Sequence, residues 1–129
     1  MQKFIKYWMP VVIWMAFIFF LSSRQRISVA DEYIINFLFF KTLHMIEYAI
    51  LYFLFFRAFY HLNNRNKSLQ KVFISAFLIP ALFAMSDEFH QTFVATREGT
   101  IRDVFIDIVG ILFMCFYIKM NIKKIKKYL

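Results

Sequence analysis

The sequence is poor in the residues that bridge, break or loosen a fold. Its 129 residues include a single cysteine, Cys115, together with two glycines and two prolines. One thiol excludes a disulfide framework and a metal site built from several cysteine ligands. So few glycines and prolines also exclude a glycine-rich phosphate loop and long flexible linkers. The chain must therefore consist mainly of regular elements joined by short loops.

Apolar residues are present in excess, at 61% of the chain with 22% aromatic, whereas soluble domains average about 45–50% apolar residues. Each of four apolar segments is close to the roughly 20 residues that cross a bilayer, where only a helix satisfies the backbone. The sequence predicts one all-α domain over residues 1–129, a four-transmembrane-helix bundle with helices at about 7–22, 36–60, 72–92 and 101–120. We favour an uncleaved first helix over a signal peptide ending near Ala30, because Arg24 and Arg26 separate the apolar run from that site.

The basic residues predict the orientation of these helices. Most of the sixteen Lys and Arg residues lie before the first span, between the second and third spans, or after the fourth. The positive-inside bias then places both termini in the cytoplasm of a multi-pass plasma-membrane protein. The net charge of +8 is explained by topology and contact with anionic lipid, so we expect the bilayer, and no nucleic acid, as a partner. The oligomeric state is left open.

All eight acidic residues fall in the outer loops or the outer part of a span on this map, and none is cytoplasmic. A rise of about 1.5 Å per residue puts Lys41, Asp87 and Asp103 at a shared height of about 22 Å, with Glu47 near the midplane. An unpaired charge at that depth costs at least about 2.5 kcal/mol, so we expect the polar faces of three helices to converge. The candidate pocket consists of Lys41, His44, Glu47, Tyr48, Asp87, Glu88, His90, Gln91, Arg97, Arg102, Asp103 and Asp107.

A purely structural role is the alternative for these residues. The expected ion pairs are Lys41 with Asp87 or Asp103, and Arg102 with Glu98 or Asp107. Helices in a membrane pack well through small residues such as Gly110, which carry no desolvation cost, and intramembrane charges usually serve function. No H-E-x-x-H pair or comparable metal signature is present, so we expect no metal and no other cofactor.

Two stretches resemble the VanZ-like family of small bacterial membrane proteins: KTLHMIEYAIL (41–51) and SDEFHQTFVATREGTIRDVFIDIVG (86–110). The family pattern is K-x-x-H-x-x-E-Y in one helix, then D-E-x-H-Q-x-F, a Pro-Gly-Arg turn, and D-x-x-x-N-x-x-G in the last helix. Two positions depart from it: Ala95-Thr96 replaces the Pro-Gly, and Asp107 replaces the Asn. The matching residues are Lys41, His44, Glu47, Tyr48, Asp87, Glu88, His90, Gln91, Phe93, Arg97, Asp103 and Gly110.

The resemblance implies a role at the Gram-positive cell envelope, where the best-known member lowers susceptibility to the glycopeptide antibiotic teicoplanin. We expect an outward-facing pocket that binds a lipid-linked cell-wall precursor or a glycopeptide, with Lys41 and Arg97 contacting phosphate or carboxylate oxygens. The rival hypothesis is a membrane-embedded enzyme in which a carboxylate and His90 act as acid and base on a lipid headgroup or wall precursor. Proton-coupled transport through Glu47 is a third hypothesis.

Overall fold

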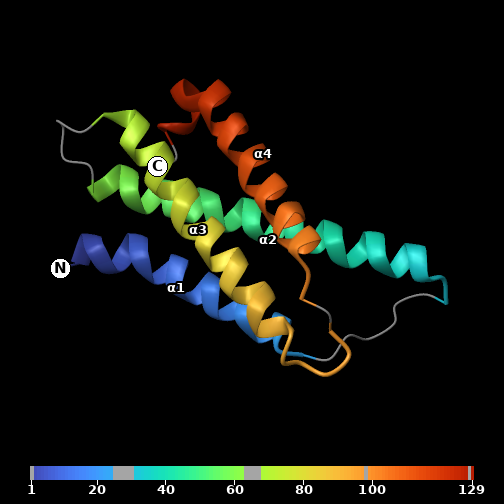
Figure 1. Ribbon diagram of the computed structural model, residues 1–129. Helices are drawn as coiled ribbons and strands as arrows, with labels where there is room; N and C mark the ends of the chain where they lie inside the picture. Colours follow the sequence, from blue (N-terminus) through green and yellow to red (C-terminus); the bar gives the residue numbers. More distant parts are fainter. Residues whose placement is uncertain (1, 25–30, 63–67, 98, 128) are drawn as a thin grey trace.

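The computed structural model describes residues 2–24, 31–62, 68–97, 99–127 and 129. The structure contains four helices in the order α1, α2, α3, α4, and no strand is present in these ranges. The all-helical architecture predicted from the sequence is confirmed. Figure 1 shows the helices, whose bounds are α1 Gln2–Ser22, α2 Tyr33–Leu62, α3 Leu69–Gln91 and α4 Ile101–Ile125.

The helices extend beyond most of the predicted ranges. α1 begins at Gln2, α2 covers Tyr33–Leu62, and α4 continues to Ile125. Hydropathy identifies the part of a helix that is apolar enough to lie in hydrocarbon. The helix itself continues into the flanking polar residues, because these residues can also adopt helical backbone angles. The proposed cleavage site near Ala30 and the charges at Arg26, Arg65, Lys67 and Glu98 lie outside the described residues.

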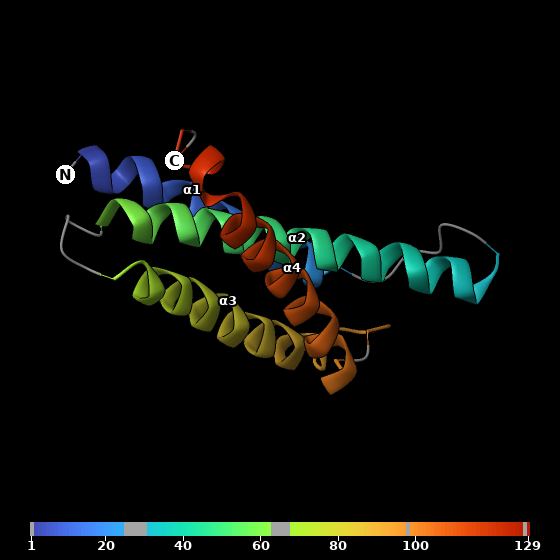
Figure 2. The ribbon, with the colours of Figure 1, turned by 90° about the horizontal axis from the view of Figure 1, so that it is seen from above.

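α2 is the central helix and packs against each of the other three. α3 contacts α4, and α1 contacts α3 only slightly. The first turns of α2 project beyond the neighbouring helices (Figures 1 and 2). A 30-residue helix is about 45 Å long, which exceeds a hydrocarbon thickness of about 30 Å.

The core is built mainly from α2. Tyr48, Leu51, Tyr52 and Phe56 are fully buried, and Ile111 of α4 packs into the same cluster. The outer faces carry exposed large apolar side chains, among them Val12, Leu82, Phe113 and Met120. Such extensive apolar exposure is typical of a surface in contact with lipid.

Three helices are long and apolar enough to cross a membrane: Phe4–Ser22 of α1, α2 and α3. α4 carries two carboxylates near its start and a lysine-rich end. Its crossing of the bilayer and the cytoplasmic location of both termini stay predictions.

Gly110 brings α4 against α2. A Cβ atom at this position would overlap the carbonyl oxygen of Met45. Only a residue without a side chain permits so close an approach of two helix backbones. The contact lies beside the charged first turns of α4 and brings them close to α2.

Candidate functional site

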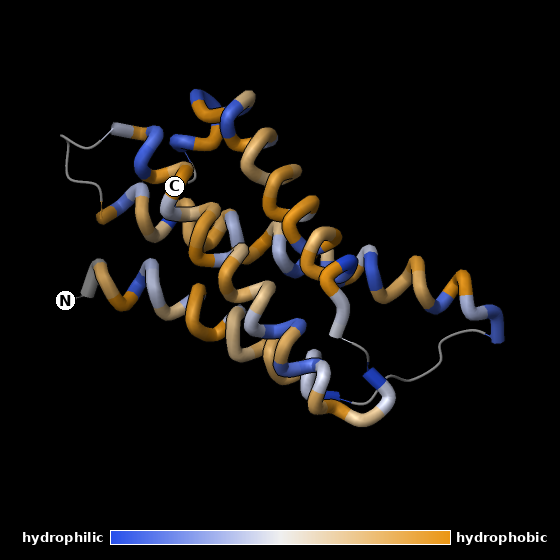
Figure 3. Tube along the Cα trace, viewed as in Figure 1, coloured by the Kyte–Doolittle hydropathy of each residue, from blue (hydrophilic) through white to orange (hydrophobic). Residues whose placement is uncertain are grey.

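Polar residues interrupt the apolar helices where α3 ends and α4 begins, as the hydropathy colouring in Figure 3 shows. Asp87, on α3, is only 1% exposed. Its Oδ2 accepts hydrogen bonds from Ser22 Oγ at 2.6 Å, Gln91 Nε2 at 3.2 Å and Tyr48 Oη at 3.5 Å. These donors come from α1, α3 and α2, so one carboxylate oxygen ties three helices together.

Lys41 and Asp103 form the second part of the site. Lys41 Nζ lies 2.6 Å from Asp103 Oδ2, and both side chains are nearly buried. Thr100 precedes α4 as its N-cap residue, and its hydroxyl accepts a hydrogen bond from Asp103 N–H at 3.3 Å. The capped first turn holds Asp103 in place opposite α2. Arg102 Nε approaches Asp103 Oδ1 at 3.6 Å, but the Arg102 side chain is 64% exposed.

Glu88 joins α3 to the start of α4. Its Oε1 accepts from Gln91 Nε2 at 3.2 Å, and its Oε2 accepts from the Thr100 N–H at 3.3 Å. Gly99 packs directly on the Glu88 backbone, where a Cβ would overlap the carbonyl oxygen. The turn after α3 therefore closes tightly over the Glu88 side chain.

Asp107 is a third carboxylate, beside Asp87 and Asp103, that has a buried oxygen without a hydrogen-bond partner among the described residues. It is 1% exposed, and the buried oxygen is its Oδ2. Glu88, Asp87, Lys41 and Asp103 all act on it electrostatically. A carboxylate oxygen left unpaired in such surroundings carries the desolvation cost with no compensating bond.

The buried charges of the described residues do not balance. Four carboxylates, those of Asp87, Glu88, Asp103 and Asp107, are between 1% and 4% exposed, whereas Lys41 is the one ammonium among the buried polar residues. His44 lies with them but is 3.3 Å from Glu47 Oε2 within α2. The cluster thus has excess acceptor and anionic capacity, which a proton, an ammonium group or a hydroxyl donor would offset.

Two predicted residues also have contacts outside this cluster. The His90 ring lies tilted against Phe19 of α1 at 4.4 Å between centroids, and its Nε2 is 3.1 Å from Ser23 Oγ. Glu47 contacts His44, and its backbone carbonyl accepts a hydrogen bond from Trp14 Nε1 at 3.0 Å. Both residues thus have contacts of their own with neighbouring side chains.

Arg97 fastens the turn after α3 to the end of α1. Its guanidinium donates to the carbonyl oxygens of Arg24 at 2.8 Å and Leu21 at 2.9 Å, and to Gln91 Oε1 at 3.4 Å. Carbonyls at a helix C-terminus have no intrahelical partner and attract a cation. These bonds hold the turn in place, and the contact of Arg97 with phosphate or carboxylate oxygens expected from the sequence stays a prediction.

Thr96 stands directly before Arg97 with a φ of 68°. That value lies in the left-handed region, which is unfavourable for a β-branched residue and free of cost for glycine. The resemblance noted above places glycine at this position. The structure thus gives a physical reason for that glycine and identifies local strain in this chain.

Ser22 is the site residue that sequence reasoning missed. It is fully buried and makes the shortest hydrogen bond to Asp87. A serine at the end of an apolar run has no distinguishing pattern, and no polar face was assigned to the first helix. The one available indication was that Ser22 lies at the predicted outer end of the first helix.

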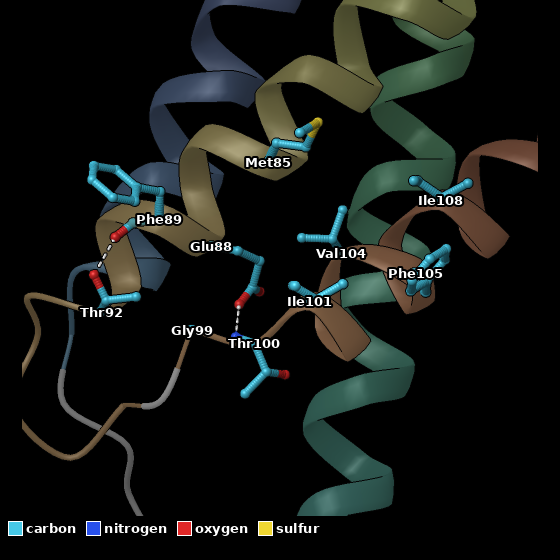
Figure 4. Close-up of a pocket in the computed structure, with 10 residues that line it drawn as sticks. All are labelled: Met85, Glu88, Phe89, Thr92, Gly99, Thr100, Ile101, Val104, Phe105 and Ile108. Atoms are coloured by element: carbon cyan, nitrogen blue, oxygen red, sulfur yellow. Dashed lines mark hydrogen bonds between the residues drawn. The ribbon is translucent and has the colours of Figure 1, made fainter.

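A cleft of about 490 Å³ opens between the end of α3 and the first turns of α4. Figure 4 shows Met85 and Phe89 on one side and Val104 and Ile108 on the other, with Glu88 between the helices. Its volume falls in the roughly 300–1,000 Å³ range of small-molecule sites. Across the described ranges, no group of three or more His, Cys, Asp or Glu residues is arranged to hold a metal ion.

Comparison with known proteins gives one match. The model of the family described as VanZ/LLP1 matches residues 7–122. No curated protein and no solved structure matches the chain. The match covers all four helices except the first residues of α1 and the last residues of α4.

Proposed function

Because the chain belongs to the VanZ-like family, we propose that it is a bacterial cell-envelope protein that lowers susceptibility to glycopeptide antibiotics of the teicoplanin type. It acts from the plasma membrane with both termini in the cytoplasm. The buried polar cluster then faces the outer leaflet. There it binds a lipid-linked cell-wall precursor or the glycopeptide itself.

The observation that carries this proposal is the charge imbalance of the cluster. Glu88 and Asp107 stand beside an ion pair that already contains the one buried lysine, Lys41. Structural ion pairs need no surplus carboxylate, because every additional buried charge adds a desolvation cost. A ligand that supplies hydrogen-bond donors offsets that cost, so the surplus favours binding over a purely structural role.

The geometry changes the roles given to the basic residues. Lys41 is committed to Asp103, and Arg97 is committed to the end of α1. Ligand contact thus falls to the carboxylates, which meet amines or hydroxyls, and Arg97 acts by holding the turn above them. The acid–base alternative retains a carboxylate and a histidine within electrostatic range, Asp87 and His90, although the His90 ring also packs against α1.

The test measures teicoplanin susceptibility in a sensitive bacterial strain that expresses the full chain. Glu88→Gln keeps the shape of the side chain but removes its charge, and Arg97→Gln releases the turn. Each variant should return susceptibility to that of the empty-vector strain while membrane levels stay unchanged. Glu32→Gln, at an exposed acid of the loop before α2, is the control and should keep wild-type resistance.

Wild-type resistance in both variants would refute the proposal. Mass spectrometry separates binding from catalysis. When a lipid-linked wall precursor is incubated with the purified protein, binding alone should leave the mass of the precursor unchanged. A product of altered mass would replace the binding proposal with the enzyme hypothesis.

A further inference from the structure

The cleft between α3 and α4 is apolar along its walls and polar at one end, where Glu88, Thr92 and Thr100 line it. Met85 and Phe89 of α3 face Val104, Phe105 and Ile108 of α4 across it (Figure 4). Met85, Phe89 and Phe105 are more than half exposed, so the cleft opens at the apolar surface of the bundle. In a bilayer this entrance faces lipid, and a hydrocarbon chain reaches it without passing through water.

Glu88 supplies the carboxylate at the polar end of the cleft and has unused hydrogen-bonding capacity. Its carboxylate offers about four acceptor sites. The structure fills two of them, with Gln91 Nε2 and the Thr100 N–H. The remaining sites accept a donor that approaches along the cleft. An acceptor of this kind selects ammonium or hydroxyl groups and repels sulfate, phosphate and carboxylate groups.

Charge narrows the choice of donor. Glu88 lies within electrostatic range of Asp103 and Lys41, and of Asp107, which has a buried oxygen without a partner. One positive charge placed beside Glu88 offsets part of this anionic surplus, whereas a neutral hydroxyl does not. The cleft therefore complements a molecule with a hydrocarbon chain and a cationic head.

We propose that the α3–α4 cleft binds the hydrocarbon chain of an amphiphile whose ammonium group hydrogen-bonds to Glu88. The inference deepens the proposed function and rests on it, because it names the chemical class of the ligand and the wall of the site that holds its chain. A membrane lipid with an amine headgroup and a molecule from outside that carries both a hydrocarbon chain and a free amine share this chemistry.

Photolabelling of the full chain in phosphatidylglycerol nanodiscs tests the proposal. The probe is a long-chain alkylamine with a diazirine in its chain, and the comparison probe is the alkyl sulfate with the same chain. The amine should label α3 and α4 residues of the cleft, such as Met85 and Val104, in a saturable manner. The sulfate should label the cleft about tenfold less, because it lacks the charge-assisted hydrogen bond.

Two variants separate chain binding from head binding. Val104→Trp fills the cleft and should abolish saturable labelling, whereas Val109→Trp, at an exposed residue of the same helix outside the cleft, should not. Glu88→Gln should reduce the preference for the amine over the sulfate. Circular dichroism checks that each variant folds, and Ile108→Phe provides a milder block should Val104→Trp unfold.

A competition experiment identifies the source of the amphiphile. Nanodiscs that also contain phosphatidylethanolamine should suppress labelling when a bilayer lipid is the ligand. Undiminished labelling in them points to an amphiphile from outside with a free amine, and both results support the proposal. Equal labelling by amine and sulfate, or labelling spread evenly over lipid-facing residues such as Leu82 and Phe113, would overturn it.

The labelling and resistance assays fail independently. Loss of resistance in Glu88→Gln without head-selective labelling would sink the cleft proposal and leave the proposed function standing. Selective labelling together with wild-type resistance in Glu88→Gln and Arg97→Gln would refute the proposed function and leave the cleft proposal standing.

Discussion

Replacement of Lys41 with methionine is the most informative perturbation of the buried cluster. Lys41 Nζ lies 2.6 Å from Asp103 Oδ2, and the two side chains are 9% and 5% exposed. Removing one member of such a pair leaves an uncompensated buried charge, which costs about 3–5 kcal/mol. Methionine matches the length of the lysine stem, so the loss of stability reports the charge and not a cavity.

The structure predicts that the reciprocal change is milder. Asp103→Asn removes the nearest carboxylate but leaves Lys41 within electrostatic range of Glu88 and Asp107. The ammonium then retains anionic neighbours, and the cost falls to that of one weakened hydrogen bond, about 1–3 kcal/mol. Lys41→Met leaves Asp103 a weaker reserve, because the Arg102 guanidinium 3.6 Å from Asp103 Oδ1 is mostly exposed and no other ammonium is found among the buried polar residues of the described ranges.

The free energy of unfolding is measured for both variants in detergent micelles, with loss of helical circular dichroism as SDS is titrated in. Lys71→Met and Arg102→Gln are the controls. Lys71 is exposed, and the Arg102 side chain is 64% exposed, so these changes should fall within about 0.5 kcal/mol of the wild type.

The order of the two effects decides the issue. An Asp103→Asn protein that is as unstable as Lys41→Met, or less stable, would refute the view that one lysine serves several carboxylates. The double variant Lys41→Met/Asp103→Leu gives the coupling energy. It should recover much of the stability lost in Lys41→Met, since a buried pair is replaced by apolar groups of similar size.

Two further predictions concern the ends of the helices. Ser22→Ala removes the hydroxyl that makes the shortest hydrogen bond to Asp87 and should destabilise the protein by about 1–3 kcal/mol in the same assay. The control is Ser86→Ala, at an exposed serine whose hydroxyl donates to the Phe83 carbonyl within α3; it should change stability little, and equal effects would contradict the assigned role of Ser22. Thr96→Gly relieves a φ of 68° and should stabilise the fold by about 1 kcal/mol. Ala95→Gly, whose φ is not positive, should not stabilise it, and a loss of stability in Thr96→Gly would show that the turn is unstrained.

Helical periodicity and membrane thickness were enough to predict the helices and the level at which charges meet. Lys41 and Asp103 were assigned the same height, and the structure pairs them at 2.6 Å. Gly110 was expected to admit a neighbouring helix, and it lies against the α2 backbone. These properties follow from residue spacing within a single helix, which the sequence determines directly.

The remaining features depend on rotations and loops that have no period. The Arg97 side chain points toward the end of α1 because α1 ends beside the turn after α3. The residue spacing around Arg97 does not reveal that relative position. His90 was included in the candidate pocket with Asp87, and its ring also contacts Phe19 of α1, which the spacing along one helix does not predict. A helical wheel gives relative directions within one helix, but not the neighbour that each direction meets.

Asp107 bears most directly on whether the cluster serves structure or function. The family pattern has asparagine at this position, which would fill the same space and supply a hydrogen-bond donor without a charge. This chain instead places a fourth carboxylate among the buried residues and leaves one of its oxygens without a partner in the described structure. A cluster that only held helices together would gain nothing from that change, because the added charge increases the desolvation cost and repels Asp87, Glu88 and Asp103. A proton or a positive group offsets that charge, so under the proposed function we expect Asp107 to increase the preference of the cluster for a cationic ligand.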